Sequence, residues 1–238
     1  MDIRLLVIAA IPVFALGLGI YLTDRFDKEP FKLLIKVFVL GMLSAIPISI
    51  IEKILVSVNV FSGLISAAYI AFIVAGLTEE FFKREVVIRT AFNHEAFNEK
   101  LDGIVYCIFS ALGFALVENI VYVVFRFSTN PHVGLYRGIL SVPAHTLFAV
   151  TMGYYLSLSK FSNNKAEAKE FFRKSLTVPI IFHGIFNFIL MSNIPMLMGI
   201  FIPFVVYLWV ISLRKLNLYY NESKSTFIKT SRDTDIKK

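Results

Sequence analysis

The chain has very little cysteine and no internal repeat. Its single cysteine, Cys107, excludes a disulfide framework and has no charged neighbour, so we expect a small buried hydrophobic residue rather than a nucleophile. Low-complexity tracts are also absent, and no second domain is expected. The first apolar run, residues 5–22, has no small-residue cleavage site before Asp24, which predicts a retained helix rather than a cleaved signal peptide.

Apolar residues are abundant: they make up 57% of the 238 residues, and the mean hydropathy is +0.71. A soluble domain contains only about 45–50% apolar residues. The excess lies in long runs, which predicts an all-α, polytopic transmembrane helical bundle. We expect seven spans, at residues 5–22, 33–55, 63–88, 103–125, 135–158, 176–191 and 194–213. Polar loops are expected at residues 93–100 and 159–174. The transmembrane domain is then residues 1–213, followed by a basic tail, residues 214–238, expected to be disordered.

Lysine and arginine are scarce in every second segment between the predicted spans. They concentrate after spans one, three and five and in the tail, whereas the other segments carry only Arg4, Lys53, Arg126 and Arg137. The positive-inside rule therefore predicts an N-terminus outside the cell and a C-terminus in the cytoplasm. Although the net charge is +7, the basic residues of such a protein report orientation, and no nucleic-acid partner is expected. The sequence predicts no particular oligomeric state.

Two adjacent acids, Glu79 and Glu80, follow the apolar part of the third predicted span. Lys83 lies four and three residues further along, so on a helix it can contact both carboxylates. It could neutralise one carboxylate and leave the other as a general base, because adjacent carboxylates repel each other at low dielectric. The alternative is a charged helix end with a solvated salt bridge.

Three further ionisable side chains lie inside apolar runs: Glu118, His145 and His183, in the fourth, fifth and sixth predicted spans. A charge near the centre of a bilayer costs at least ~3 kcal/mol on insertion scales, so each residue is a candidate functional group. Arg137 shares a broad helical face with His145, and Asn187 shares one with His183. The alternative is that each polar side chain only makes packing hydrogen bonds.

Together these residues predict an active site between the third and sixth helices, because four consecutive spans each carry an acid or an imidazole. Carboxylates and imidazoles are the groups from which water-activating hydrolytic sites are built. The pattern therefore indicates a membrane-embedded hydrolase, and a peptide bond is the expected substrate.

The ordered set resembles a known family. In chain order, the sequence carries Glu79-Glu80-x-x-Lys83, Phe114-x-x-x-Glu118, His145 and His183-x-x-x-Asn187. This arrangement is similar to that of the PrsW intramembrane proteases, bacterial relatives of the CAAX prenyl endopeptidase superfamily. Asp24-Arg25 and Glu29-Pro30, after the first span, also look like that family. The resemblance covers residues 1–213.

The resemblance implies an endopeptidase of the bacterial plasma membrane. It would make the site-1 cut in a single-span membrane protein, an anti-sigma factor of a stress response. Glu79 or Glu80 would activate water, and Glu118, His145 and His183 would complete the site, supported by Lys83, Arg137 and Asn187. Glu118, His145 and His183 match the ligands of a catalytic zinc ion with an open water position. A metal-free glutamate mechanism fits the same residues.

Two other functions share some of these features. A CAAX-type prenyl-protein endopeptidase, or an immunity-type relative, would use a similar site, but those enzymes have His where this chain has Glu118. A proton- or cation-coupled transporter could use buried acids and histidines as relays, although the chain shows no inverted repeat. Convergence of the ionisable groups on one closed site favours a protease, whereas a continuous polar path favours a transporter.

Overall fold

Helices make up the fold, because an apolar chain in lipid must satisfy its backbone hydrogen bonds within each segment. The computed structural model describes residues 3–130 and 132–236. In this part, seven helices are long and apolar enough to cross a membrane. The elements are α1 (Ile3–Thr23), α2 (Phe31–Ser57), α3 (Gly63–Ala68), η1 (Tyr69–Leu77), α4 (Thr78–Thr90), α5 (Lys100–Ile120), η2 (Val121–Arg126), α6 (His132–Tyr136), η3 (Arg137–Ser141), α7 (Val142–Phe161), α8 (Lys165–Met191) and α9 (Pro195–Ile236). The multi-pass, all-α prediction is therefore confirmed.

The structure corrects the predicted loop at residues 159–174. Most of this segment belongs to α8, which begins at Lys165 and not at residue 176. The Asn164 side chain caps the helix by accepting a hydrogen bond of 2.9 Å from the backbone N–H of Ala166. The helix-forming residues 165–170, Lys-Ala-Glu-Ala-Lys-Glu, then carry the first turns outside the apolar stretch.

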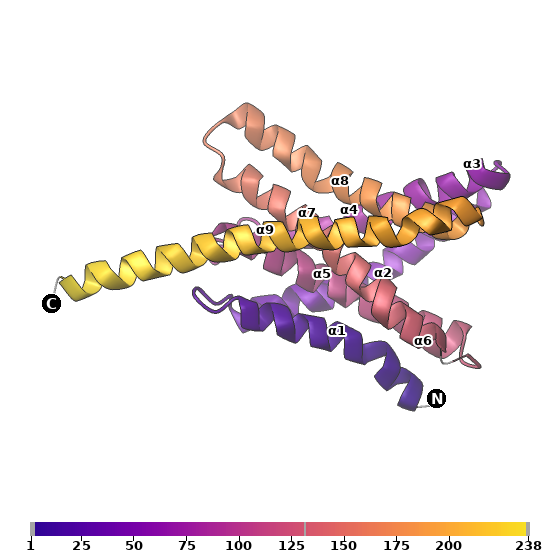
Figure 1. The fold of residues 1–238 in the computed structure, drawn as a ribbon, viewed down its shortest axis with the longest axis horizontal. Coiled ribbons are helices and arrows are strands. Elements are labelled where there is room, and N and C mark those ends of the chain that lie inside the picture. Colours follow the sequence, from indigo (N-terminus) through magenta and orange to yellow (C-terminus); the bar gives the residue numbers. More distant parts are fainter. Residues whose placement is uncertain (1–2, 131, 237–238) are drawn as a thin grey trace.

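The tail was expected to be disordered; in the structure residues 214–236 continue the α9 helix. Figure 1 shows this helix extending beyond the bundle toward the C-terminus. Its first turns after Leu213 are held by packing: Tyr219 stacks on Tyr154 with ring centroids 5.1 Å apart, and Arg25 donates a hydrogen bond of 2.6 Å to the Tyr220 hydroxyl. Lys237 and Lys238, the last residues of the predicted tail, lie outside the described residues.

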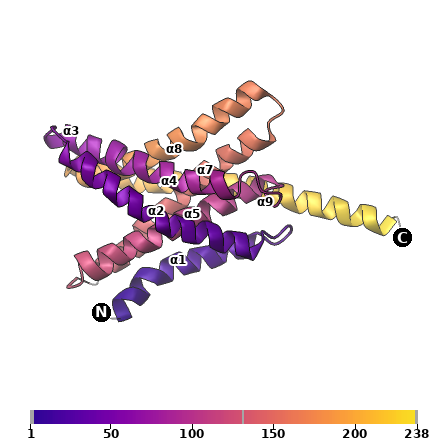
Figure 2. The same ribbon diagram turned by 180° about the vertical axis from the view of Figure 1, so that it is seen from behind.

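The helices α5 and α7 form the centre of the bundle. In their apolar windows 72% and 67% of the residues are buried, against 17% in the outer helices α1 and α9. Cys107 of α5 lies in this core, as the sequence predicts. Figures 1 and 2 show α5 between α1, α2 and α7.

Glycines let α2 and α5 approach with their backbones nearly in contact. A Cβ atom added at Gly113 would lie 2.0 Å from the Phe38 carbonyl oxygen, and one at Gly41 would lie 2.2 Å from that of Ser110. Such close approach through small residues is a common way for membrane helices to pack. It also fixes α5, and therefore Glu118, relative to the other helices.

Replacing Gly113 with Ala is expected to destabilise the protein by ~1–3 kcal/mol, because the methyl group meets rigid backbone and forces α2 and α5 apart. Thermal unfolding in detergent measures the effect. Gly199 of α9 is the matched control, because nothing lies within 4 Å of a Cβ added there. An equal melting temperature for the Gly113→Ala and Gly199→Ala variants would contradict the close-packing argument.

The loop between α1 and α2 folds back on itself through buried acids. One carboxylate oxygen of Asp24 accepts a hydrogen bond of 3.1 Å from the backbone N–H of Glu29, and the Tyr106 hydroxyl of α5 donates to Glu29. Burial raises the pKa of Asp24 to about 6 and the pKa of Glu29 to about 7. Burial therefore favours the protonated form of both carboxyl groups, more strongly for Glu29 than for Asp24.

Candidate active site

The adjacent acids lie in the middle of a span and not at a solvated helix end. The elements α3, η1 and α4 form one continuous stretch, Gly63–Thr90, that is long enough to cross the membrane. Glu79 is 5% exposed and Glu80 is 1% exposed. The π-helical segment η1 ends immediately before them, and such segments often occur at functional sites. The burial excludes the solvated salt bridge that the sequence left open.

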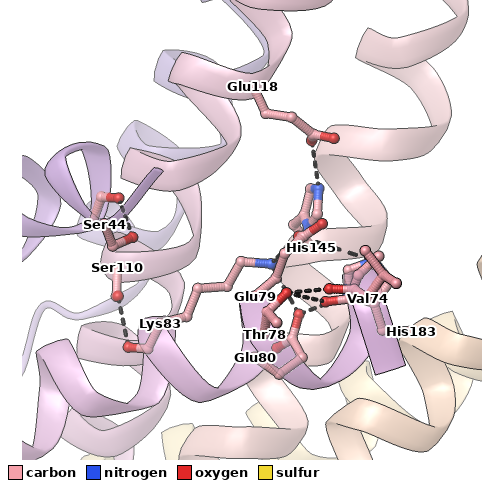
Figure 3. A network of polar contacts seen from close by, with 12 residues as sticks. Ser44, Val74, Thr78, Glu79, Glu80, Lys83, Ser110, Glu118, His145 and His183 are labelled. Atoms are coloured by element: carbon pink, nitrogen blue, oxygen red, sulfur yellow. Dashed lines mark hydrogen bonds and ion pairs between the residues drawn. The ribbon is translucent and has the colours of Figure 1, made fainter. Parts of the chain in front are cut away.

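Lys83 joins the two acids to a histidine. Its ammonium lies 2.9 Å from Glu79 Oε2, 2.9 Å from Glu80 Oε1 and 3.0 Å from His145 Nδ1 (Figure 3). The side chain is 1% exposed and its Nζ lies 4.4 Å from the centre of the Phe114 ring. Because these contacts are buried, the single ammonium offsets one of the two carboxylate charges, and one net negative charge remains in the group.

His183 reaches the acids because α8 packs closely against η1. A Cβ atom added at Gly184 would lie 2.1 Å from the Phe72 ring, and one at Gly76 would lie 3.2 Å from the Ile180 carbonyl oxygen. This approach places His183 Nδ1 2.9 Å from Glu80 Oε1. A carboxylate can only accept, so Nδ1 donates the proton and Nε2 keeps a free lone pair.

His145 is held from its opposite side by Glu118. His145 Nε2 lies 3.0 Å from Glu118 Oε2, and Arg137 Nη2 lies 2.7 Å from the same oxygen. Arg137 also donates a hydrogen bond of 2.9 Å from Nε to Asn119. Since the Lys83 ammonium can only donate, the Nδ1 lone pair of His145 accepts this hydrogen bond, and the ring proton is on Nε2.

One ring nitrogen of each histidine lies near the same acid. Glu79 Oε2 lies 4.0 Å from His145 Nδ1 and 4.0 Å from His183 Nε2. Glu79, Glu80, His145 and His183 each offer one ligand atom within 4.8 Å of the others, and all four are buried. This donor set of carboxylates and imidazoles is one that zinc and related metals accept.

Glu118 lies outside this group, although the sequence predicted it as a metal ligand with His145 and His183. Its carboxylate instead contacts the nitrogen of His145 that points away from Glu79. Metal-binding histidines commonly donate their second ring N–H to a carboxylate, which fixes the tautomer and the ring orientation. Glu118 lies where such a carboxylate is expected, within hydrogen-bond distance of His145 Nε2.

The predicted residues thus converge on one hydrogen-bonded network, which is buried at Glu79, Glu80, His145 and His183 and partly exposed at Glu118 and Arg137. Asn187 is the exception: it is half-buried, and its side chain makes no hydrogen bond to any residue that the structure describes.

Sequence analysis missed Glu52 of α2, which is half-buried and is an electrostatic neighbour of Glu79, Glu118 and Lys83. The signal was present, because Glu52 is an acid inside the second apolar run.

Comparisons with known proteins agree with this site. A family model described as PrsW family intramembrane metalloprotease matches residues 29–213. The chain is 42% identical over 229 residues to the protease PrsW of Clostridioides difficile (strain 630), covering 95% of this chain and 96% of that protein. It is 37% identical over 206 residues to the protease PrsW of Bacillus subtilis (strain 168), covering 86% and 90% of the two chains. No solved structure matches the chain significantly.

These matches favour the PrsW resemblance over the CAAX-type and transporter alternatives, and the buried group of acids and histidines supplies the matching chemistry. The chain is a membrane-embedded peptidase and belongs to the PrsW family of intramembrane metalloproteases.

Proposed function

We propose that the protein cleaves a peptide bond of a single-span membrane protein, and that this substrate is an anti-sigma factor anchored in the bacterial plasma membrane. The observation that carries the proposal is the convergence of Glu79, Glu80, His145 and His183 within 4.8 Å at a buried position. A hydrolytic site inside the helical bundle, on a span such as Gly63–Thr90, is suited to a substrate that is itself anchored in the membrane. The substrate class itself rests on the family resemblance.

The residues present fit a zinc ion by their donor chemistry. His145 Nδ1, His183 Nε2 and a carboxylate of the Glu79–Glu80 pair would hold it. Such an ion, when bound, polarises the scissile carbonyl and lowers the pKa of a bound water. Lys83 donates to His145 Nδ1 in the structure, so this hydrogen bond must open before that nitrogen can bind a metal.

Glu79 is the residue we assign as general base. Its Oε2 lies 4.0 Å from one ring nitrogen of each histidine and accepts one hydrogen bond, from Lys83, whereas Glu80 Oε1 accepts hydrogen bonds from both Lys83 and His183. Glu79 therefore takes the proton of the attacking water and passes it to the leaving amine. The Lys83 ammonium, within reach of the same point, stabilises the negative charge that develops on the carbonyl oxygen.

The direct test is cleavage of candidate single-span membrane proteins, anti-sigma factors among them, by the purified wild-type protein and by Glu79→Ala. The proposal expects a defined cut by the wild type and none by the variant. If the wild type cuts only unrelated membrane proteins, the anti-sigma substrate is wrong while the peptidase site stands.

Replacing Glu118 with Gln is expected to lower kcat/KM by ~10–100-fold, the usual range for a residue that orients a metal-binding histidine. The amide keeps the shape but loses the charge that pairs with Arg137 and holds the N–H of His145. Peptidase kinetics and zinc affinity measure the change. If Glu118→Asp has a kcat/KM between those of the Gln variant and the wild type, Glu118 positions His145. Wild-type kinetics for Glu118→Gln would exclude this role.

The distribution of basic residues supports an N-terminus outside and a C-terminus in the cytoplasm. Reporter fusions after Lys165, at the start of α8, and after Lys224, on the α9 extension, should both give a cytoplasmic signal. An external signal from the Lys224 fusion would reverse the orientation of α9.

A further inference from the structure

Asn119 of α5 is fully buried, at 0% exposure, and joins two other elements of the bundle. Its Nδ2 donates a hydrogen bond of 2.8 Å to the backbone carbonyl oxygen of Ala9 in α1, and its Oδ1 accepts one of 2.9 Å from Arg137 Nε in η3. A carbonyl oxygen can only accept and a guanidinium can only donate, so both bonds require the same orientation of the amide. Asn119 therefore presents a fixed acceptor to Arg137.

Arg137 transmits this orientation to Glu118 through its guanidinium. While Nε donates to Asn119, Nη2 forms an ion pair of 2.7 Å with Glu118 Oε2. The guanidinium carbon also lies 4.0 Å from the centre of the Tyr122 ring, which supports the planar group from a third direction. Because the guanidinium is planar and rigid, a partner that fixes Nε also fixes the position of Nη2.

The Glu118 side chain needs such support more than the other acids of the site. It is 21% exposed, against 6% for Glu79 and 1% for Glu80. A partly exposed glutamate has several rotamers available, and only some of them keep Oε2 beside the His145 ring. The same oxygen lies 3.0 Å from His145 Nε2 (Figure 3) and pairs with Arg137, so the position of Arg137 selects the rotamers that hold the histidine.

Close apolar contacts already hold α1 against the bundle at this level. A Cβ atom added at Gly134 would lie 2.5 Å from Ile8 Cγ2, and one at Gly138 would lie 3.3 Å from Pro12 Cγ. Such packing through small residues does not require a polar side chain. The hydrogen bond from Asn119 to Ala9 is therefore better explained by the amide orientation that it imposes than by the attachment of α1.

We propose that Asn119 is a positioning residue of the peptidase site. Anchored on the Ala9 carbonyl of α1, it fixes Arg137, and through Arg137 it keeps the Glu118 carboxylate on the Nε2–H of His145. This series of contacts is called here the relay. Metal-binding histidines depend on outer partners of this kind. The effect on cleavage rests on the function proposed for His145, whereas the hydrogen bonds of the relay can be tested without cleavage.

The first measurement is the NMR signal of the histidine ring N–H protons, in full-length, chelator-treated protein labelled with ¹⁵N in histidine. A ring N–H that donates a strong hydrogen bond to a carboxylate resonates far downfield and exchanges slowly with water. The structure contains two such protons, on His145 Nε2 facing Glu118 and on His183 Nδ1 facing Glu80. Asn119→Leu should move the first signal upfield and speed its exchange, and it should leave the second signal unchanged.

The second measurement is peptidase kinetics. Asn119→Leu should lower kcat by ~10-fold, at the low end of the range for outer partners of metal-binding histidines. KM should stay nearly unchanged, because the buried Asn119 is inaccessible to substrate. In a Glu118→Gln background, Asn119→Leu should have no further effect on kcat, because the relay is already broken there.

Arg137→Lys tests the same link without altering the buried amide, in case Asn119→Leu folds poorly. Lysine keeps the positive charge beside Glu118 but lacks the planar fork that holds both partners at once. This variant should therefore reproduce the upfield shift of the His145 signal and the loss of kcat.

Ser157→Ala is the matched control. Ser157 is also 0% exposed and donates a hydrogen bond of 2.7 Å to the Lys100 carbonyl oxygen, which joins α7 to α5 at the other end of α7 from His145. Its loss should lower the melting temperature, as Asn119→Leu does, and should leave both NMR signals and kcat at the wild-type values.

The proposal is overturned if the His145 signal is the same in the wild type, Asn119→Leu and Arg137→Lys, or if Ser157→Ala moves it equally. It is also overturned if Asn119→Leu lowers kcat by the same factor with and without Glu118→Gln, because the two residues would then act independently. The NMR result does not require cleavage, so it separates a failure of the relay from a failure of the proposed function.

Discussion

Replacing Glu79 with Gln is expected to lower peptidase activity by ~100-fold or more, the usual scale for loss of a general base. The amide preserves the shape of the side chain and its contact with Lys83, but it cannot accept a proton. Because His145 and His183 are unchanged, the variant should still bind metal. Cleavage rates and metal content, measured on the same preparation, check both parts of the prediction.

Glu85 offers the matched control, since it lies on the same helix but pairs with Arg89 at the surface of the bundle, 3.1 Å away. Glu85→Gln should cleave at the wild-type rate. The assignment of Glu79 as base fails if Glu79→Gln stays fully active. If this variant loses its metal together with its activity, Glu79 is a ligand rather than the base.

Replacing His145 or His183 with Ala is expected to abolish both metal binding and cleavage. Each histidine presents one lone pair to the centre of the site while its other nitrogen is held by Glu118 or Glu80, and a catalytic metal with three protein ligands is held weakly when one is lost. Elemental analysis of the purified variants measures the metal. A chelator that reaches the site should inactivate the wild type, and zinc should restore it.

His94 is the control for this pair, because it is exposed in the loop before α5. Its Ala variant should keep metal and activity. Full activity of chelator-treated protein that has lost its metal would support the metal-free glutamate mechanism and would remove zinc from the proposal. Retained metal in both His145→Ala and His183→Ala would place the ion elsewhere.

Much of the site could be predicted from local sequence, because a charge inside an apolar run is conspicuous wherever the run folds. Glu118, His145 and His183 were identified on this ground, and the structure places all three in one network. Their partners could not be assigned in the same way. Spacing gives the face of a helix that a residue occupies, but not how that helix is rotated toward its neighbours.

The rotation of each helix about its axis matters most for the partners of the carboxylates. Sequence analysis grouped Glu118 with the two histidines as metal ligands, whereas the structure places Glu79 and Glu80 beside them and Glu118 behind His145. The π-helical segments η1 and η3 precede the parts of α4 and α7 that carry the candidate site. Their wider turns change the direction in which the following side chains point, so an ideal helical spacing cannot predict it.

The sequence by itself determined the seven spans, the family and the residues proposed to carry the chemistry, because hydrophobic length and buried charge are local properties of the chain. Only the tertiary structure decided which acid meets which histidine, because Gly76 and Gly184 set how closely η1 and α8 pack. It also decided that the tail is helical, since α9 gains contacts with Arg25 and Tyr154 that no local pattern contains. These contacts join residues far apart in the chain, so their free energy cannot be predicted from the sequence of either segment alone.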